Sequence, residues 1–206
     1  MCRESREDKE CLLTKSRKDK KDRKRIVVAA TGASGLPMQI IRGDSDYESI
    51  LILSDSAKIT LQQETKDTVE EIEALADQVC DTKDIGAGPA SGSFRTEGML
   101  IVPCSMKTVA GIHSGYADNL ILRAADVTIK EQRTLVLAAR ETPLSAIHLR
   151  NLSELATIPG VRIIPPMMTF YHQPENIEEM TYHIAAKLVE PFGIEAREYR
   201  RWTGLV

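Results

Sequence analysis

The sequence predicts a single α/β domain with a doubly wound, mainly parallel sheet of the flavodoxin or Rossmann type. Short apolar segments of β type alternate with helical segments along the chain. The apolar segments lack polar–apolar alternation, which is typical of strands covered by helices on both faces. Polar and glycine-containing turns follow them, and α/β sheets bind ligands at the carboxyl ends of their strands. The 206 residues, 42% hydrophobic and 28% charged, suffice for one buried core.

Five apolar segments are predicted to be strands, because they are short, continuous and bounded by turn residues. They span residues 25–30, 49–54, 98–104, 134–140 and 160–166. Because no internal repeat and no linker is apparent, residues 25–206 are assigned to one domain.

The segments between these strands are predicted to be helices. A short helix is expected to begin near Leu36-Pro37, since proline is acceptable in a first turn. A helix over 67–78 is predicted from apolar residues at helical spacing. Its apolar face consists of Val69, Ile72, Leu75, Ala76 and Val79. The other predicted helices span residues 56–64, 106–113, 119–132, 144–157 and 176–190.

Charge is distributed unevenly along the chain. The net charge is −3, but residues 1–25 carry eleven Lys or Arg and six Asp or Glu, which leaves −8 on the remainder. An acidic folded domain argues against a nucleic-acid partner. We interpret residues 1–24 as a charged, disordered arm, with contact to RNA or an acidic partner as the alternative.

The sequence also bears on the cellular compartment. No apolar run is long enough to span a membrane. The arm lacks the apolar core of a secretory signal, and its acidic residues make it a poor transit peptide. The four cysteines are scattered without C-x-x-C spacing, which indicates a reducing compartment without disulfides or a zinc site.

Two strand ends carry residue types that suit phosphate or flavin binding. After the first strand, Gly32 and Gly35 flank Ser34, which suits either a phosphate-binding turn or a tight structural turn. After the third strand, the segment 105–108 places two hydroxyls around Lys107, which suits a phosphate or a flavin edge. Its simpler interpretation is a helix cap with a surface lysine.

Other reactive residue types have less support in the sequence. Arg140 and Glu141 are either a surface ion pair or a general acid/base beside a phosphate. Cys104 has no basic partner in the sequence, so we interpret it as a buried small hydrophobe. The four histidines form no metal-ligand pattern and are interpreted as surface or packing residues, so no metal is expected.

Taken together, long segments of the chain resemble the UbiX flavin prenyltransferases, whose members were formerly called phenylacrylic acid decarboxylases. The resemblance runs from about Arg25 to the C-terminus, with only the charged arm outside it. The segments that carry it are "TGASG", "SGSFRTEGMLIVPCSMKTVAGIHSGYADNLILRAADVTIKE", "LVLAARETPLSAIHLRNL", "IIPPMMTFYHQPENIEE" and "RRWTGL".

The resemblance implies a metal-independent prenyltransferase. Its reaction joins a dimethylallyl group from dimethylallyl phosphate to N5 and then C6 of reduced FMN. The product, prenylated FMN, serves a UbiD-type decarboxylase. The resemblance further implies a homo-oligomer, typically a dodecamer, with FMN between subunits. It implies a mitochondrial location for a fungal member and a cytoplasmic one otherwise.

Site residues are carried over by position from the same family. Those implied to bind FMN are Gly32, Ala33, Ser34, Ser54, Ser105, Met106, Lys107, Thr108 and Arg140. Those implied to bind dimethylallyl phosphate are Lys130, Arg140, Tyr171 and Lys187. Those implied to act in catalysis are Ser34 near flavin N5, Lys130 at the phosphate, and Glu141 in proton transfer.

The sequence departs from the family pattern in two places. About four residues are missing after Gly35, and Gln39 stands where glycine is common, so the first helix is expected to be short and to crowd the flavin loop. Lys187 replaces an arginine, which keeps the charge but loses bidentate contact with phosphate. The alternative function is therefore a catalytically impaired FMN-binding or regulatory subunit of a decarboxylase system.

Overall fold

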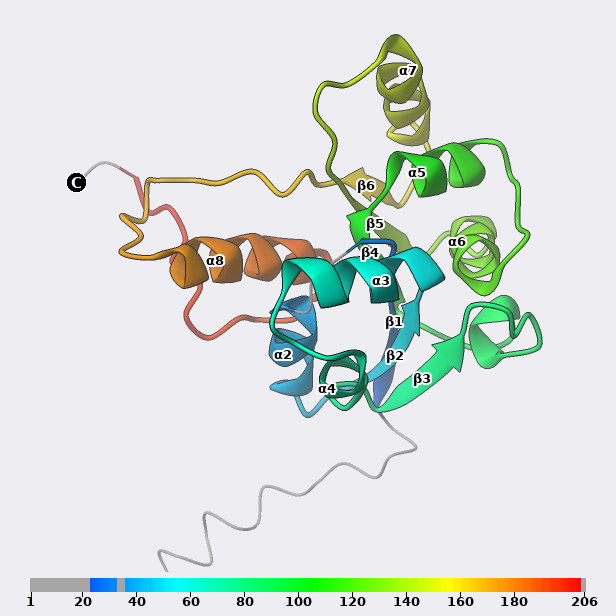
Figure 1. Ribbon diagram of the computed structural model, residues 1–206, viewed down its shortest axis with the longest axis horizontal. Helices are drawn as coiled ribbons and strands as arrows, with labels where there is room; N and C mark the ends of the chain where they lie inside the picture. Colours follow the sequence, from blue (N-terminus) through cyan, green and yellow to red (C-terminus); the bar gives the residue numbers. More distant parts are fainter. Residues whose placement is uncertain (1–22, 33–35, 205–206) are drawn as a thin grey trace, which may run out of the picture.

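The computed structural model describes residues 23–32 and 36–204. Its centre is one sheet of six parallel strands in the order β3-β2-β1-β4-β5-β6 (Figure 1). The strands are β1 (Lys24–Ala30), β2 (Tyr47–Leu53), β3 (Gln78–Asp81), β4 (Gly98–Cys104), β5 (Thr134–Ala139) and β6 (Val161–Ile163). The predicted doubly wound parallel sheet is confirmed.

Helices cover both faces of this sheet, as predicted. One face packs against α2 (Leu36–Arg42), α3 (Asp55–Glu64), α4 (Val69–Glu73) and α8 (Ile177–Val189). The other face packs against α5 (Met106–His113), α6 (Leu120–Lys130) and α7 (Ala146–Leu155). Single 3-10 turns, η2 (Gly88–Ala90) and η3 (Glu190–Phe192), precede β4 and follow α8.

Burial on both faces of the sheet explains why the central strands are continuously apolar. In β1, Ile26 and Val28 belong to the core beneath α2 and α8, whereas Val27 and Ala29 belong to the core beneath α5 and α6. Because successive side chains of a strand point to opposite faces, a strand with two cores needs apolar residues at every position.

The region 67–81 differs from the prediction. The helix begins as expected, with a capping box formed by Thr68 and Glu71, but it ends after Glu73. Residues 78–81 form the edge strand β3, in which Val79 is 43% exposed and Cys80 is buried. Val79 was wrongly placed on a helical face, because four residues of an edge strand with one buried side chain have too few apolar positions to show a period of two.

The first and last segments of the expected domain differ in detail from the prediction. Residues 1–22 of the expected arm lie outside the described residues, so that part stays a prediction. Arg23 forms an ion pair with Asp77 at 2.8 Å, and β1 begins at Lys24. At the other end, β6 is shorter than predicted, and the chain beyond it runs outward beside α8 (Figure 1). In the described part of the chain, no helix is long and apolar enough to cross a membrane.

Candidate functional site

The centre of the candidate site is the junction between β1 and β4. The chain winds from β1 toward β3 on one side and from β4 toward β6 on the other, so these neighbours mark the topological switch point. Thr31 joins their ends: its amide and its hydroxyl both donate to the Pro103 carbonyl, at 3.1 and 3.0 Å. The Ser105 amide in turn donates to Thr31 Oγ1 at 2.8 Å. The two strand ends are therefore fixed relative to each other.

Gly32 is required at this junction because the backbone passes directly over Pro103. A Cβ atom on Gly32 would lie 2.8 Å from Pro103 Cγ, closer than such atoms approach. Gly32 thus lies at the switch point, as expected for a ligand-binding turn. The predicted residues Ala33 and Ser34 lie outside the described residues, so their contacts with flavin stay predictions.

Two predicted flavin-binding serines begin helices at the same edge of the sheet. Ser54 Oγ accepts the Ala57 amide at 3.0 Å and caps α3. Ser105 Oγ accepts the Thr108 amide at 3.3 Å and caps α5, so the cap interpretation is correct. Capping and ligand binding are compatible, because a capped helix still directs the amides of its first turn outward.

A cavity of about 540 Å³ lies along this edge. The N-termini of α3, α5 and α6 meet there, since Ser54, Ser105 and Asn119 all line it and cap those helices. Each helix N-terminus carries a partial positive charge, and three together favour an anion such as a phosphate. Lys83 and Lys107 add positive charges to the lining, and Asp55 and Asp118 add negative ones. Lys83 pairs with Asp55 at 3.8 Å, which leaves the charge of Lys107 available to an anion.

The cavity contains residues that the sequence analysis did not select. Thr82 follows β3, the strand that was not predicted, and its carbonyl accepts the Leu120 amide at 2.7 Å. Tyr116 and Asn119 also line the cavity, and an Asn directly before an apolar helix was an available capping signal. The predicted Met106 is buried in the core and does not line the cavity.

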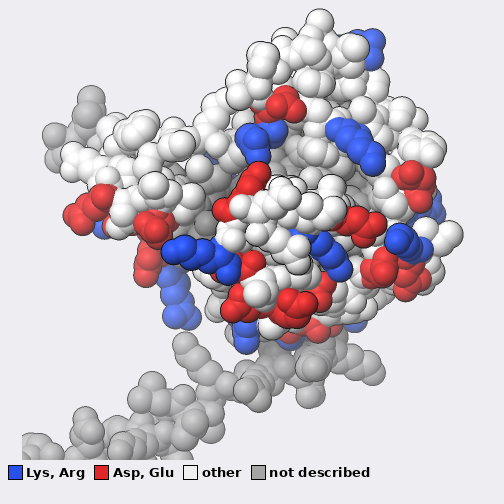
Figure 2. All heavy atoms as spheres, viewed as in Figure 1, with Lys and Arg blue, Asp and Glu red and all other residues white. Residues whose placement is uncertain are grey.

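Arg140 and Glu141 follow β5 at the same edge but do not line this cavity within one chain. Both are exposed, and Glu141 Oε1 accepts the Thr142 amide at 2.9 Å. Figure 2 shows Lys and Arg interspersed with Asp and Glu over the visible face, with no basic patch among its coloured atoms. These two residues thus lie on an open rim beside the cavity.

Lys130 lies far from the cavity in the same chain. It is the last residue of α6, whose first turn borders the cavity, so the 11 residues of the helix separate them by about 15 Å. Its ammonium group bonds Glu131 at 2.6 Å, and this hydrogen bond lowers the pKa of Glu131. The position of Lys130 does not match a role in the cavity of its own chain.

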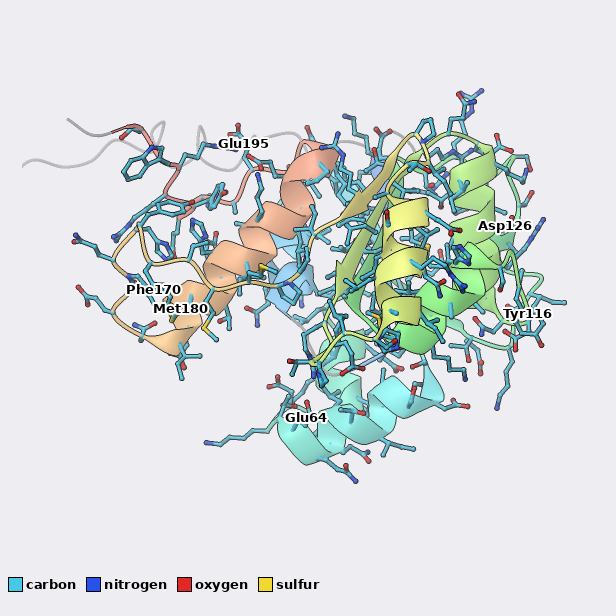
Figure 3. All side chains as sticks on the ribbon, turned by 90° about the horizontal axis from the view of Figure 1, so that it is seen from above. Glu64, Tyr116, Asp126, Phe170, Met180 and Glu195 are labelled. Atoms are coloured by element: carbon cyan, nitrogen blue, oxygen red, sulfur yellow. The ribbon has the colours of Figure 1, made fainter. Side chains whose placement is uncertain are left out.

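Tyr171 and Lys187 belong to a different region, around α8. Figure 3 shows Phe170 and Met180 of this region on one side of the molecule and Tyr116, which lines the cavity, on the other. The Tyr171 hydroxyl bonds His183 at 3.0 Å, and Lys187 Nζ bonds Glu190 at 2.6 Å. The structure therefore does not join the predicted phosphate-binding residues into one site within one chain.

A second, larger cavity of about 700 Å³ lies between α8 and the C-terminal segment. No strand end borders it, so its position suits a nucleotide less well than that of the first cavity. Gln39 of the short helix α2 lines this second cavity and not the first. The expected short helix is confirmed, since α2 has 7 residues. The expected crowding of the flavin loop concerns residues 33–35, which lie outside the described residues, and stays a prediction.

The remaining candidate residues have structural roles. Cys104 is completely buried, which raises the pKa of its thiol to about 12 and confirms its interpretation as a small hydrophobe. His113 pairs with Glu154 at 2.5 Å, and His148 completes the capping box of α7. No group of metal-ligating side chains occurs among the residues that the structure describes.

The fold and the first cavity together define a mononucleotide-binding protein of the doubly wound α/β class. The sequence profile of the Flavoprotein family matches residues 14–189. The flavin prenyltransferase LpdB of Lactiplantibacillus plantarum is 50% identical over 186 residues, which cover 88% of this chain and 99% of that protein.

Solved structures agree with this match. A dodecameric FMN-dependent UbiX-like decarboxylase from Escherichia coli O157:H7 is 45% identical with a TM-score of 0.83, covering 87% of this chain and 100% of that one. AnUbiX (PadA1), in complex with FMN and dimethylallyl pyrophosphate, is 44% identical with a TM-score of 0.84, covering 89% and 100%. The chain belongs to the Flavoprotein family and, within it, to the UbiX-like flavin prenyltransferases.

Proposed function

We propose that this protein transfers a dimethylallyl group from dimethylallyl phosphate to N5 and C6 of reduced FMN. The prenylated FMN would then serve a UbiD-type decarboxylase. The observation that carries the proposal is the cavity at the switch point, with three helix N-termini, in a chain 50% identical to a named flavin prenyltransferase. The impaired FMN-binding subunit gains no support from relatives that bear the name of the enzyme.

FMN is assigned to the first cavity. Ser54, Ser105 and Thr108 offer hydroxyls, Lys107 offers a charge, and Gly32 allows close approach of the backbone. Met106 would contribute through its backbone. This donor set fits a phosphorylated flavin, because amides and hydroxyls bind phosphate and ring edges without needing a metal.

The residues assigned to dimethylallyl phosphate suit the departure of a phosphate. As the ester C–O bond breaks and the bond to flavin N5 forms, negative charge accumulates on the leaving phosphate. Lys130, Arg140 and Lys187 would stabilise that charge more in the transition state than in the ground state. Tyr171 would donate a hydrogen bond to the phosphate, and Glu141 would carry a proton during closure at C6.

We propose that neighbouring copies of the chain complete this site. Within one chain, Lys130, Tyr171 and Lys187 all lie outside the first cavity. Phe170 is 70% exposed, and Met167, Ile177 and Trp202 are also exposed, so the region around α8 presents the kind of apolar surface that marks an interface. A homo-oligomer, for which we propose a dodecamer, would bury this surface. The prediction of a cytoplasmic location, or a mitochondrial one for a fungal chain, stays a prediction.

The test is anaerobic incubation of the purified protein with reduced FMN and dimethylallyl phosphate. The extracted flavin is expected to gain the mass of one dimethylallyl group, measured by mass spectrometry. A parallel reaction with dimethylallyl diphosphate identifies the donor. An unchanged flavin mass from both donors, with FMN demonstrably bound, would reject the prenyltransferase and support the binding subunit.

A further inference from the structure

Tyr171 belongs to a compact cluster of rings between α8 and the C-terminal segment. Its ring meets those of His172, His183 and Trp202 edge-on, with centroids 5.5, 5.3 and 5.9 Å apart. His183 stacks on His172 at 4.1 Å and lies against Tyr199 at 4.6 Å. The imidazole of His183 is therefore held on two sides while it contacts Tyr171.

The hydrogen-bond partners of His183 determine where its proton lies. Nε2 is 3.3 Å from the Arg200 carbonyl, which can only accept, so Nε2 carries the hydrogen. Nδ1 is 3.3 Å from the Thr169 hydroxyl and accepts from it in the neutral ring. Nε2 also lies 3.0 Å from the Tyr171 oxygen, so its one hydrogen is shared between that oxygen and the Arg200 carbonyl. His183 thus donates to Tyr171 rather than accepting from it.

The surroundings keep His183 neutral. Burial lowers its pKa below the ordinary 6.5, and the neighbouring His172 and Lys187 lower it further, against the opposing effect of the Arg200 carbonyl. A neutral ring has one N–H, which the preceding contacts assign to Nε2. Near neutral pH the polarity of the contact with Tyr171 is therefore fixed.

Tyr199 packs against His183, on the ring that contacts Tyr171. Burial, together with the neighbouring Tyr171 and Glu190, raises the pKa of Tyr199 to about 12, so this phenol stays protonated. Because the Tyr171 oxygen accepts from His183, the hydrogen of Tyr171 itself remains for an outside acceptor, and Tyr171 is 42% exposed.

We propose that His183 is a positioning residue that fixes Tyr171 as a hydrogen-bond donor toward the phosphate of the prenyl donor. The inference rests on the proposed function and on the role assigned there to Tyr171. A donor to the phenol oxygen also polarises its O–H, which strengthens its hydrogen bond to an anion. His183 acts through Tyr171 and does not itself contact the substrate.

The test measures formation of prenylated FMN by the full-length protein at varied dimethylallyl phosphate, for wild type and variants. His183→Leu is expected to raise the KM for dimethylallyl phosphate about fivefold to tenfold, the effect of one hydrogen bond, with FMN affinity unchanged. His183→Gln keeps an N–H donor near the Nε2 position and is expected to restore most of the wild-type KM.

A double-mutant cycle with Tyr171→Phe isolates the coupling. In the Tyr171→Phe background, His183→Leu is expected to change KM by less than about twofold, because the group it positions is already absent. Tyr182→Phe is the matched control: it removes a contact between α8 and the Glu198 amide at 3.4 Å but leaves the Tyr171 cluster intact. It is expected to keep the wild-type KM.

Each outcome separates this inference from the proposed function. If wild type forms no prenylated flavin, the proposed function fails, and the inference fails with it. If wild type is active, the inference alone is overturned by an unchanged or lower KM in His183→Leu, by a full effect in the Tyr171→Phe background, or by an equal effect of Tyr182→Phe. Failure of His183→Gln to restore the KM when His183→Leu raises it would also overturn it.

Discussion

Cys104 and Glu141 lie at the ends of neighbouring strands, and their different burial gives them different reactivity. Cys104 is the last residue of β4 and is sealed in the core, so its thiol stays protonated and unreactive. Glu141 follows β5 on an exposed rim, where a carboxylate can exchange protons with a substrate. Sequence patterns nominated both positions, and their surroundings decide that only Glu141 is available for chemistry.

Cys104 is expected to resist alkylation in the folded protein. At pH 9 an ordinary thiol is half ionised, whereas this thiol, with a pKa of about 12, stays protonated. Peptide mapping after iodoacetamide treatment should show labelling of Cys104 only after unfolding in urea. Because unfolding releases this proton above about pH 9, the Cys104 contribution to stability should fall as the pH rises toward 12. Rapid labelling of the folded protein would contradict this assignment.

Glu141→Gln is expected to keep FMN binding and to lower kcat by roughly a hundredfold or more, because it removes a proton carrier. Lys187→Ala is expected mainly to raise the KM for dimethylallyl phosphate, because it removes a phosphate contact. Flavin titration and steady-state kinetics of both variants check these expectations. Equal loss of flavin in the two variants would show that neither residue has the assigned role.

At the scale of elements, helix caps connect folding to the site. Ser54, Ser105 and Asn119 each end a loop, start a helix and border the cavity. The same local signal that begins a helix therefore orients its amides toward the ligand. Most helices could therefore be predicted together with the residues at their N-termini that border the cavity. Strand β3 could not be predicted, because only one of its four side chains is buried.

Ser105→Ala is expected to lower the free energy of unfolding by about 1 kcal/mol and also to weaken FMN binding about fivefold to tenfold. Thr68→Ala is the matched control, since Thr68 caps α4 with a bond of 3.2 Å to the Glu71 amide and lies outside the cavity. It should cost similar stability but leave FMN affinity unchanged. Urea denaturation and flavin titration separate the two effects, and equal FMN affinities in both variants would refute a direct role of Ser105.

At the scale of the whole molecule, three residues proposed to bind the prenyl phosphate are exposed and lie outside the first cavity of their own chain. Lys130 ends α6 about 15 Å from the cavity wall. Tyr171 contacts His183 of α8, and Lys187 belongs to α8. Figure 3 shows Phe170 and Met180 of this region on the side of the molecule opposite Tyr116. A single chain therefore presents the cavity proposed for FMN in one place and the residues proposed for the prenyl phosphate in others, which fits the proposal of a site shared between copies.

Mixed oligomers test this arrangement. Lys130→Ala and Glu141→Gln are each expected to be nearly inactive alone. When the two chains are unfolded and refolded together in equal amounts, roughly a quarter of wild-type activity should return, if each site takes Lys130 and Glu141 from different copies. Refolding each variant separately before mixing is the control. If co-refolded samples stay inactive, both residues serve the same chain's site.

The sequence by itself determined the fold class, the long helices, five of the six strands and most of the strand ends that border the first cavity. These features follow from local patterns: continuous apolar segments, capping residues, and glycines directly after a strand. Only the tertiary structure decided the pairing of β1 with β4, the edge strand β3, and the separation of Lys130 from the cavity. It also placed His183 against Tyr171, 12 residues earlier in the chain. Such contacts depend on packing between distant segments, which no local pattern encodes.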